Sequence, residues 1–344
     1  MNMLLNTLYV TVQGAYVHLD NETVRIEADG KSVARIPLHH LSSLVMFGNV
    51  LVSPQLLAKC AKEGRSVAYF DINGRFSCRI EGPVSGNILL RHAQYKAYET
   101  LTVKVDIARN IVAGKIRNTR TLQRRSARES DCKEEADRLK ASADRATEML
   151  RRLERVDTLD EIRGIEGKVA REHFEVFPLM IKKQLRTDFE FTGRNRRPPR
   201  DKVNAMLSFI YTLLTHDAVS AIEGIGLDPR EGFLHAIRPG RPALALDLVE
   251  EFRAMLGDRI VLAIVNRRQI GVKDFDVFPG GSVLLNDRGR KIVLAAYQNR
   301  KKEMIAHPLF KEKVAFGLLV HIQARILARY LRKDIPEYLP MLFR

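Results

Sequence analysis

The sequence contains few cysteines. Its 344 residues include only Cys60, Cys78 and Cys132, which are widely spaced and form no Cys-x-x-Cys pair. An odd number of cysteines without paired spacing indicates neither a disulfide framework nor a structural zinc site. This cysteine usage agrees with a reducing compartment.

Long apolar runs are also missing. No stretch approaches the roughly 18 consecutive apolar residues that a membrane-spanning helix requires. Residues 1–12 have neither the basic start nor the small-residue cleavage site of a secretory signal. We therefore expect a cytoplasmic protein without a membrane partner.

Acidic residues are too few to balance the basic ones. The chain has 57 Lys and Arg residues against 41 Asp and Glu residues, a formal net charge of +16. This excess favours a polyanionic partner, and nucleic acid fits better than a membrane surface. Two basic stretches, residues 91–128 and 193–200, carry the candidate DNA-binding residues: Arg91, Lys115, Arg117, Arg120, Arg124, Arg196 and Arg197.

The first of these stretches contains only two acids, Glu99 and Asp106. A charged helix face is solvated by default, but the near absence of acids favours contacts with phosphates. The second stretch is interrupted by Pro198 and Pro199, so it is predicted to be a loop. That loop is either a mobile DNA contact or a solvated linker.

Short β-rich runs alternate with turn signals over residues 4–52, a pattern typical of an antiparallel sheet or small sandwich. Ser53 and Pro54 then predict the start of a helix that ends near Gly64, and Asn73-Gly74 predicts a hairpin. From about Ile88 the apolar spacing becomes helical. We predict an α+β protein, with an N-terminal β-sandwich-like dimerisation domain at residues 1–86 and a larger all-α catalytic domain at residues 87–344.

Two later segments offer the side chains of a metal site. Glu166 lies in a helical pattern between Gly164 and Gly167, and His235 precedes a helical segment with Asp247 and Glu250 three residues apart. Carboxylates and an imidazole can bind a divalent metal that acts on a phosphodiester. Taken singly, Glu166 is equally a surface residue, His235 a core or loop histidine, and Asp247 a cap or an ion-pair partner of Arg241 or Arg253.

Motifs along essentially the whole chain resemble the CRISPR adaptation integrase family, the first and most widespread of the Cas proteins. They include Gly164-Ile165-Glu166-Gly167, Asn204-Ala205-Met206-Leu207-Ser208, Gly232-Phe233-Leu234-His235 and Asp247-Leu248-Val249-Glu250. The opening strand and the stretch Gly86-Asn87-Ile88-Leu89-Leu90-Arg91 are most similar to the type I-C branch.

This resemblance implies that Glu166, His235 and Glu250 are the catalytic metal ligands, that Asp247 is a supporting acid, and that the metal is Mg²⁺ or Mn²⁺. It implies that a DNA 3′-hydroxyl attacks a phosphodiester at the CRISPR repeat, so that a spacer is inserted. It also implies a homodimer, joined through the β-rich domain and assembled with the small second Cas protein on double-stranded DNA. His173 stands where the family commonly has tyrosine, so we expect either surface packing or a polar DNA contact there.

Two alternatives remain open from the sequence. The same metal and basic surface would serve a structure-selective nuclease that acts on branched DNA. A non-catalytic DNA-binding scaffold, whose acids are merely solvated, belongs to a different class.

Overall fold

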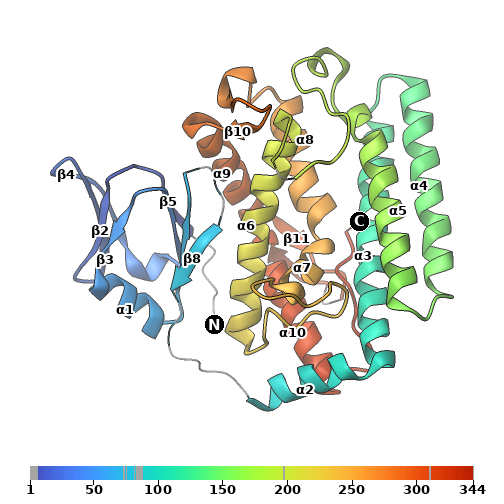
Figure 1. Cartoon of the computed structure of the whole chain (residues 1–344), viewed down its shortest axis with the longest axis horizontal. Coiled ribbons are helices and arrows are strands. Elements are labelled where there is room, and N and C mark those ends of the chain that lie inside the picture. The colour runs from blue at the N-terminus through green and yellow to red at the C-terminus, as the bar shows by residue number, and fades with distance from the viewer. Residues whose placement is uncertain are drawn as a thin grey trace.

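A strand-rich N-terminal part and a larger helical part lie side by side in the computed structural model (Figure 1). The structure describes residues 7–343 except 73, 75, 81, 83–87, 197 and 310. The predicted order, strands first and helices second, is confirmed. The boundary predicted between residues 86 and 87 lies outside the described residues.

The strand-rich part contains two four-stranded sheets, ordered β1-β5-β7-β8 and β4-β3-β2-β6. Its elements are β1 (Thr7–Val10), β2 (Tyr16–Asp20), β3 (Thr23–Ala28), β4 (Lys31–Pro37), β5 (Ser43–Phe47), β6 (Leu51–Val52), α1 (Pro54–Lys62), β7 (Ser66–Phe70) and β8 (Phe76–Ile80). Strand pairs β1–β5, β5–β7 and β2–β6 are parallel, so the antiparallel sheet that the sequence offered as one possibility is wrong, and the sandwich-like arrangement stays a prediction. Parallel neighbours need a crossover, and here α1 and the β2–β4 segment provide it.

The helix start predicted at Ser53 and Pro54 and the predicted hairpin are both confirmed. Helix α1 begins with Pro54, and the Ser53 hydroxyl accepts a hydrogen bond from the Leu56 backbone N–H. Strands β7 and β8 pair antiparallel, as the Asn73-Gly74 signal predicts, although Asn73 itself lies outside the described residues.

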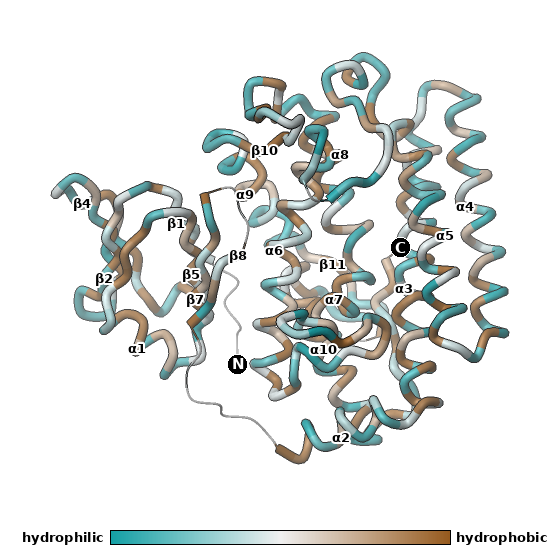
Figure 2. The backbone as a smooth tube through the Cα atoms, viewed as in Figure 1, coloured by the Kyte–Doolittle hydropathy of each residue, from teal (hydrophilic) through white to brown (hydrophobic). Residues whose placement is uncertain are grey.

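The helical part is built from nine longer helices among the described residues. They are α2 (Ile88–Glu99), α3 (Leu101–Arg128), α4 (Lys133–Leu153), α5 (Leu159–Val176), α6 (Lys202–Ile225), α7 (Ala243–Glu250), α8 (Arg259–Asn266), α9 (Asp287–Lys302) and α10 (Leu319–Leu331). Hydrophobic and hydrophilic residues alternate along α4 and α5 at helical spacing (Figure 2). A one-sided apolar stripe of this kind packs each helix against its neighbours.

The prediction that this part is all-α is wrong, because two small hairpins interrupt the helices. They pair β9 (Phe275–Val277) with β10 (Val283–Leu285), and β11 (Met304–Ala306) with β12 (Lys313–Ala315). The first hairpin turns through Gly280 and Gly281, both with positive φ. Glycine adopts this backbone conformation at little cost, which explains the turn.

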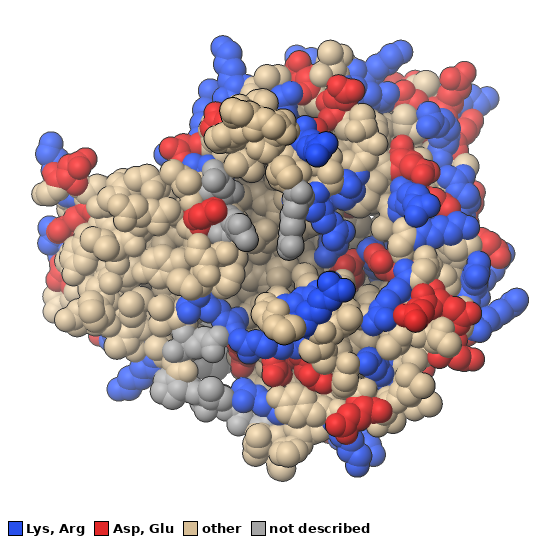
Figure 3. All heavy atoms as spheres, in the orientation of Figure 1, with Lys and Arg blue, Asp and Glu red and all other residues tan. Residues whose placement is uncertain are grey.

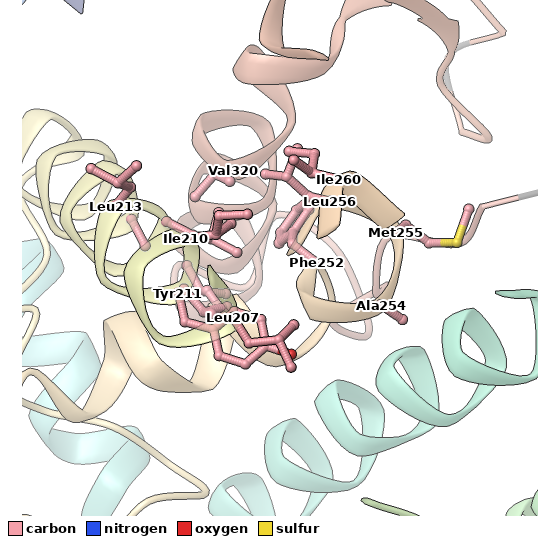
Figure 4. Close-up of a cluster of buried hydrophobic side chains, with 14 of the residues drawn as sticks. Leu207, Ile210, Tyr211, Leu213, Phe252, Ala254, Met255, Leu256, Ile260 and Val320 are labelled. Atoms are coloured by element: carbon pink, nitrogen blue, oxygen red, sulfur yellow. The ribbon is translucent and has the colours of Figure 1, made fainter. Parts of the chain in front are cut away.

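Helix α6 is the centre of the molecule. Leu207, Ile210 and Leu213 pack toward Phe252, Leu256, Ile260 and Val320 (Figure 4). By length and a mean hydropathy of 1.3, α6 could cross a membrane, which the sequence analysis did not single out. Two thirds of that apolar window is buried here, so its hydrophobicity is accounted for by the core.

The other side of α6 contacts the strand-rich part. The ring of Phe209 lies 6.0 Å from that of Phe47 in β5, and His216 contacts the ring of Phe70 in β7 edge-on. Arg79 in β8 forms an ion pair with Glu223. The sheet β1-β5-β7-β8 is therefore packed directly on the core helix.

Candidate active site

Four segments, far apart in the sequence, meet at one polar cluster. Helix α5 contributes Glu166, the loop before α7 contributes His235, α7 contributes Asp247 and Glu250, and α3 contributes Lys115. The structure thus brings together the acids and the histidine that the sequence analysis singled out. It also adds a lysine in their midst.

Glu166 is placed by the burial pattern of α5. Thr158 caps the helix by accepting a hydrogen bond from the Glu161 backbone N–H. Ile162, Ile165 and Val169 then form a buried stripe along the helix. Glu166 lies beside this stripe with 26% of its side chain exposed, so it can contact both the interior and a molecule at the surface.

Asp247 organises the loop that carries His235. Its fully buried carboxylate accepts hydrogen bonds from the backbone N–H groups of Phe233, Leu234 and His235, at 2.6, 3.0 and 2.9 Å. It also contacts His235 Nδ1 at 2.7 Å. A Cβ at Gly232 would lie 2.8 Å from this carboxylate and 2.6 Å from Ala243 backbone carbon, so only glycine fits there.

The contact with Asp247 sets the orientation of the imidazole. The second ring nitrogen, His235 Nε2, lies 3.8 Å from Glu250 Oε1. Among the described residues, Asp247 therefore contacts His235 and the backbone before it, and forms no ion pair with Arg241 or Arg253. Arg253 Nη2 instead pairs with Glu250 Oε1 at 3.0 Å.

Glu250 is buried, with 2% of its side chain exposed. Burial opposes its ionisation, but the charges of Arg253, Lys115 and His235 outweigh burial and lower the pKa of Glu250 to about 2. The carboxyl group is therefore ionised throughout the neutral range. Its Oε2 atom lies 2.6 Å from Lys115 Nζ, yet that contact lacks hydrogen-bond geometry and the oxygen has no hydrogen-bond partner.

The structure places Lys115, which was predicted to contact DNA, inside the polar cluster, and the predicted DNA contact stays a prediction. Its side chain is only 10% exposed and forms ion pairs with both Glu166 and Glu250. Burial alone would lower the pKa of Lys115, but Glu250 and Glu166 outweigh burial and raise that pKa above its ordinary value. The ammonium therefore stays charged between two carboxylates.

The donor set suits Mg²⁺ or Mn²⁺. Two carboxylates and one imidazole are available, and a carboxylate behind the imidazole is the usual second-layer partner of a metal-binding histidine. The unbonded Oε2 of Glu250 adds a buried acceptor. Across the described residues, however, no three His, Cys, Asp or Glu side chains converge closely enough to hold an ion, and Lys115 Nζ lies between two of the acids.

The remaining predicted DNA-binding residues lie in varied settings. Arg117 and Arg124 are exposed on α3, and Arg196 is exposed in the loop before α6. Arg120 is partly buried and donates to Thr147 Oγ1, while Arg91 donates to the Gly226 carbonyl. Arg197 lies outside the described residues. Lys and Arg side chains border the hollow between the two parts on the face shown in Figure 3.

His173 lies in the interior, so the expectation of surface packing or a DNA contact is wrong. Its Nε2 contacts Asp258 Oδ2 at 3.0 Å, and Tyr211 donates a hydrogen bond to the other oxygen of that carboxylate. The guanidinium of Arg253 lies 5.0 Å from the centre of the Tyr211 ring. The sequence analysis missed this buried network beside the site.

Comparisons with known proteins identify one family over most of the chain. The family model described as CRISPR associated protein Cas1 matches residues 8–299. Over the full length of both chains, the sequence is 52% identical to the CRISPR-associated endonuclease Cas1 1 of Moorella thermoacetica and 48% identical to that of Chlorobaculum tepidum. No branch of the family is distinguished by these matches, so the type I-C likeness stays a prediction.

Solved structures share the fold. A casposase bound to integration product superposes with a TM-score of 0.82 at 21% identity, covering 97% of this chain and 92% of that chain. A Cas1 protein from Thermotoga maritima gives 0.81 at 24% identity, covering 97% and 98%. The family model and the full-length relatives show that the chain belongs to the CRISPR-associated Cas1 family.

Proposed function

We propose that this chain is a metal-dependent DNA integrase that inserts short DNA fragments into a CRISPR repeat array. The observation that carries the proposal is the polar cluster in which Glu166 and Glu250 both contact Lys115, while His235 lies 3.8 Å from Glu250 and is oriented by Asp247. A casposase bound to integration product has the same fold, and the full-length relatives are named endonucleases.

In this proposal Glu166, His235 and Glu250 hold Mg²⁺ or Mn²⁺. When bound, the ion would supply stabilisation of the charge that develops on the phosphate oxygens and on the leaving oxygen. Asp247 retains a proton on His235 Nδ1, which leaves the Nε2 lone pair facing Glu250. Arg253 holds Glu250 in place and offsets its charge.

The reaction exchanges one phosphodiester for another. The 3′-hydroxyl oxygen of a fragment end forms a bond to phosphorus in the repeat, and the bond from that phosphorus to the leaving 3′-oxygen breaks. The proton lost by the attacking hydroxyl balances the proton gained by the leaving oxygen. No covalent bond to a side chain is needed, so the chain requires no serine, cysteine or tyrosine nucleophile.

The surface beside Glu166 leaves room for DNA. Gly164 and Gly167 are exposed, and a Cβ at either position would meet nothing within 4 Å. The basic residues of α3 and of the loop before α6 would then contact phosphates, which position DNA without base readout. This open surface supports a substrate that approaches from the side of α5.

The test is strand transfer on a branched DNA with the full chain and Mn²⁺. Glu166→Ala, His235→Ala and Glu250→Ala should each reduce joining by at least about a hundredfold while DNA binding is retained, because each removes a proposed ligand. Glu172→Ala is a matched control, since Glu172 lies on the same helix but pairs with Arg145. Full joining by the Glu250→Ala variant would contradict the assignment and would transfer the role to Asp247.

The second candidate is a structure-selective nuclease, which the relatives' name of endonuclease favours. The same assay separates the two, because an integrase yields joined strands and a nuclease yields cleaved strands. A non-catalytic scaffold would bind the DNA and give neither product in any variant.

The proposed partners are double-stranded DNA, a second copy of the chain and the small second Cas protein. The likeness to a solved complex named Cas6-RT-Cas1–Cas2 supports that assembly, with a TM-score of 0.80. We place the homodimer contact in the strand-rich part and the protein in the cytoplasm. Sedimentation of the full chain, alone and with the partner, tests the assembly.

A further inference from the structure

The geometry points to Lys115 as a built-in counter-ion that competes with the divalent cation for Glu166 and Glu250. This inference rests on the proposed metal site and goes beyond it. It assigns to Lys115 the control of how tightly the site binds the ion. Lys115 is thus a positioning residue for the two carboxylates rather than a DNA contact.

The first step is the location of the ammonium. Lys115 donates to Glu166 and lies 2.6 Å from Glu250 Oε2, so its single charge is shared by two carboxylates from different helices. These are two of the three proposed ligands. A cation bound by both carboxylates would have to occupy the space around Lys115 Nζ or repel it at close range.

The second step is the rigidity of the backbone that carries Lys115. Asn118, one turn later on α3, donates to the carbonyls of Glu251 and Met341, and it accepts from the Phe343 backbone N–H. A Cβ at Gly114 would lie 2.7 Å from Pro340, so the C-terminal segment is packed against this turn. The helix is fixed here, and the flexible four-carbon side chain of Lys115 is the element that can move.

The third step is the environment of Glu250. Its Oε2 is buried, and Lys115 Nζ, 2.6 Å away, is the charged group that faces it. Lys115 therefore neutralises this carboxylate at the atom that a metal ion would bind. A metal ion that binds Oε2 directly would form a new bond to this oxygen. The site would then lose the favourable contacts between the Lys115 ammonium and the two carboxylates.

Mn²⁺ binding by the full chain without DNA tests the inference. In Lys115→Met the carboxylates keep their charge and lose the competing ammonium, so Mn²⁺ should bind roughly 10- to 100-fold more tightly, the equivalent of one charge-assisted hydrogen bond. Without Mn²⁺ the variant should melt at a lower temperature than wild type, because buried Glu250 and half-buried Glu166 each lose an ion-pair partner. Added Mn²⁺ should raise its melting temperature more than that of wild type.

Lys301→Met is the matched control. Lys301 is also a buried lysine, paired with the carboxylate of Asp217 at 2.7 Å, but outside this cluster. Its replacement should lower the melting temperature at every Mn²⁺ concentration and leave Mn²⁺ affinity unchanged. If Lys115→Met fails to fold, Lys115→Gln removes the charge and keeps a polar terminus, and the same gain in affinity is expected.

Two failures can be told apart by calorimetric titration. Equal or weaker Mn²⁺ binding by the Lys115 variants, with binding lost in His235→Ala, would overturn the role of Lys115 and leave the metal site standing. Mn²⁺ binding that is unaffected in both Glu166→Ala and His235→Ala would overturn the proposed metal site itself.

Discussion

At the scale of single residues, Lys115 and three acids set the charge around His235. Glu166, His235, Asp247 and Glu250 carry the chemistry in their side chains, and the structure places them together. Lys115 was assigned to DNA because charge shows in a sequence and burial does not. The sequence did contain a signal of burial. Lys115 lies four residues after Ile111 and three after Val112, so it shares a helix face with these two apolar residues, which are buried on α3.

Other residues of the site gave no usable sequence signal. Asp258 is an acid eight residues after Glu250 that belongs to none of the motifs, and only folding brings it to His173 and Tyr211. The three backbone hydrogen bonds that Asp247 accepts depend on the shape of a loop, which side-chain spacing does not encode. Tertiary pairing of this kind requires a structure.

The glycines beside Glu166 permit a prediction that separates stability from function. Gly164 and Gly167 lie inside α5 without positive φ, and a Cβ there would meet nothing within 4 Å. Gly167→Ala should therefore stabilise the protein by about 0.5 to 1 kcal/mol through helix propensity. If DNA approaches this face, the same substitution should lower the rate of strand transfer several-fold. Chemical denaturation measures the stability, and a strand-transfer assay measures the activity.

Gly224→Ala is the control for that experiment. Gly224 lies near the end of α6, where a Cβ is equally unobstructed, so its replacement should stabilise the fold and leave strand transfer unchanged. Undiminished joining by both Gly164→Ala and Gly167→Ala would show that DNA does not pass close to these glycines.

At the scale of elements, local patterns predicted helices and hairpins better than strand pairing. The cap at Ser53 is decided by neighbouring residues and is present, and β7 and β8 pair antiparallel as the local hairpin signal predicts. The parallel pairing of β1 with β5 joins Thr7 to Ser43, a choice made by distant segments that no local pattern records. The short strands β9 to β12 have three residues each, too few for a periodic signal.

The exposed face of helix α3 is where DNA binding can be tested by mutation. Arg117 and Arg124 are exposed there, and Arg124 has only a solvent-exposed ion pair with Asp144. Reversing both to Glu should weaken binding of all sequences alike. It should also reduce the slope of log affinity against log salt by roughly two, at about 0.9 per lost phosphate contact.

The same net charge change on α4 controls for long-range electrostatics. Arg138 and Arg151 are exposed on that helix, and Arg151 pairs only with Glu148. Reversing these two should change the salt slope little. An unchanged slope in the α3 variant would mean that its basic face is merely solvated.

At the scale of the whole molecule, α6 is shared by the two parts. One side of α6 packs in the helical core, and the other side packs on the sheet of β1, β5, β7 and β8. A truncated chain that begins at Ile88 would therefore expose the apolar face of α6. A change in its oligomeric state could result from misfolding as well as from a lost dimer contact. Point substitutions in the full chain are the better probe of how the parts cooperate.

His216 reports on this junction through pH. It contacts the rings of Phe70 and Phe76 and lies 3.4 Å from Ser66 Oγ. Burial lowers the pKa of His216 to about 4, from an ordinary value of 6.5. The charge of Asp217 opposes this change, and the charges of Arg79 and Lys301 add to it. The folded protein thus keeps His216 neutral at a pH where the unfolded chain binds a proton.

Stability should therefore fall as the pH drops from 6.5 toward 4, because protonation favours the unfolded chain. At pH 5 the loss from this one group is about 2 kcal/mol. His216→Phe cannot titrate, so the difference in its unfolding free energy between pH 7.5 and pH 5 should be smaller than that of wild type by about this amount. The control variant His39→Gln, at an exposed histidine, should lose as much stability as wild type. If the stability of His216→Phe fell as steeply with pH as that of wild type, the junction would be open to water in solution, with α6 and the sheet not packed as a unit.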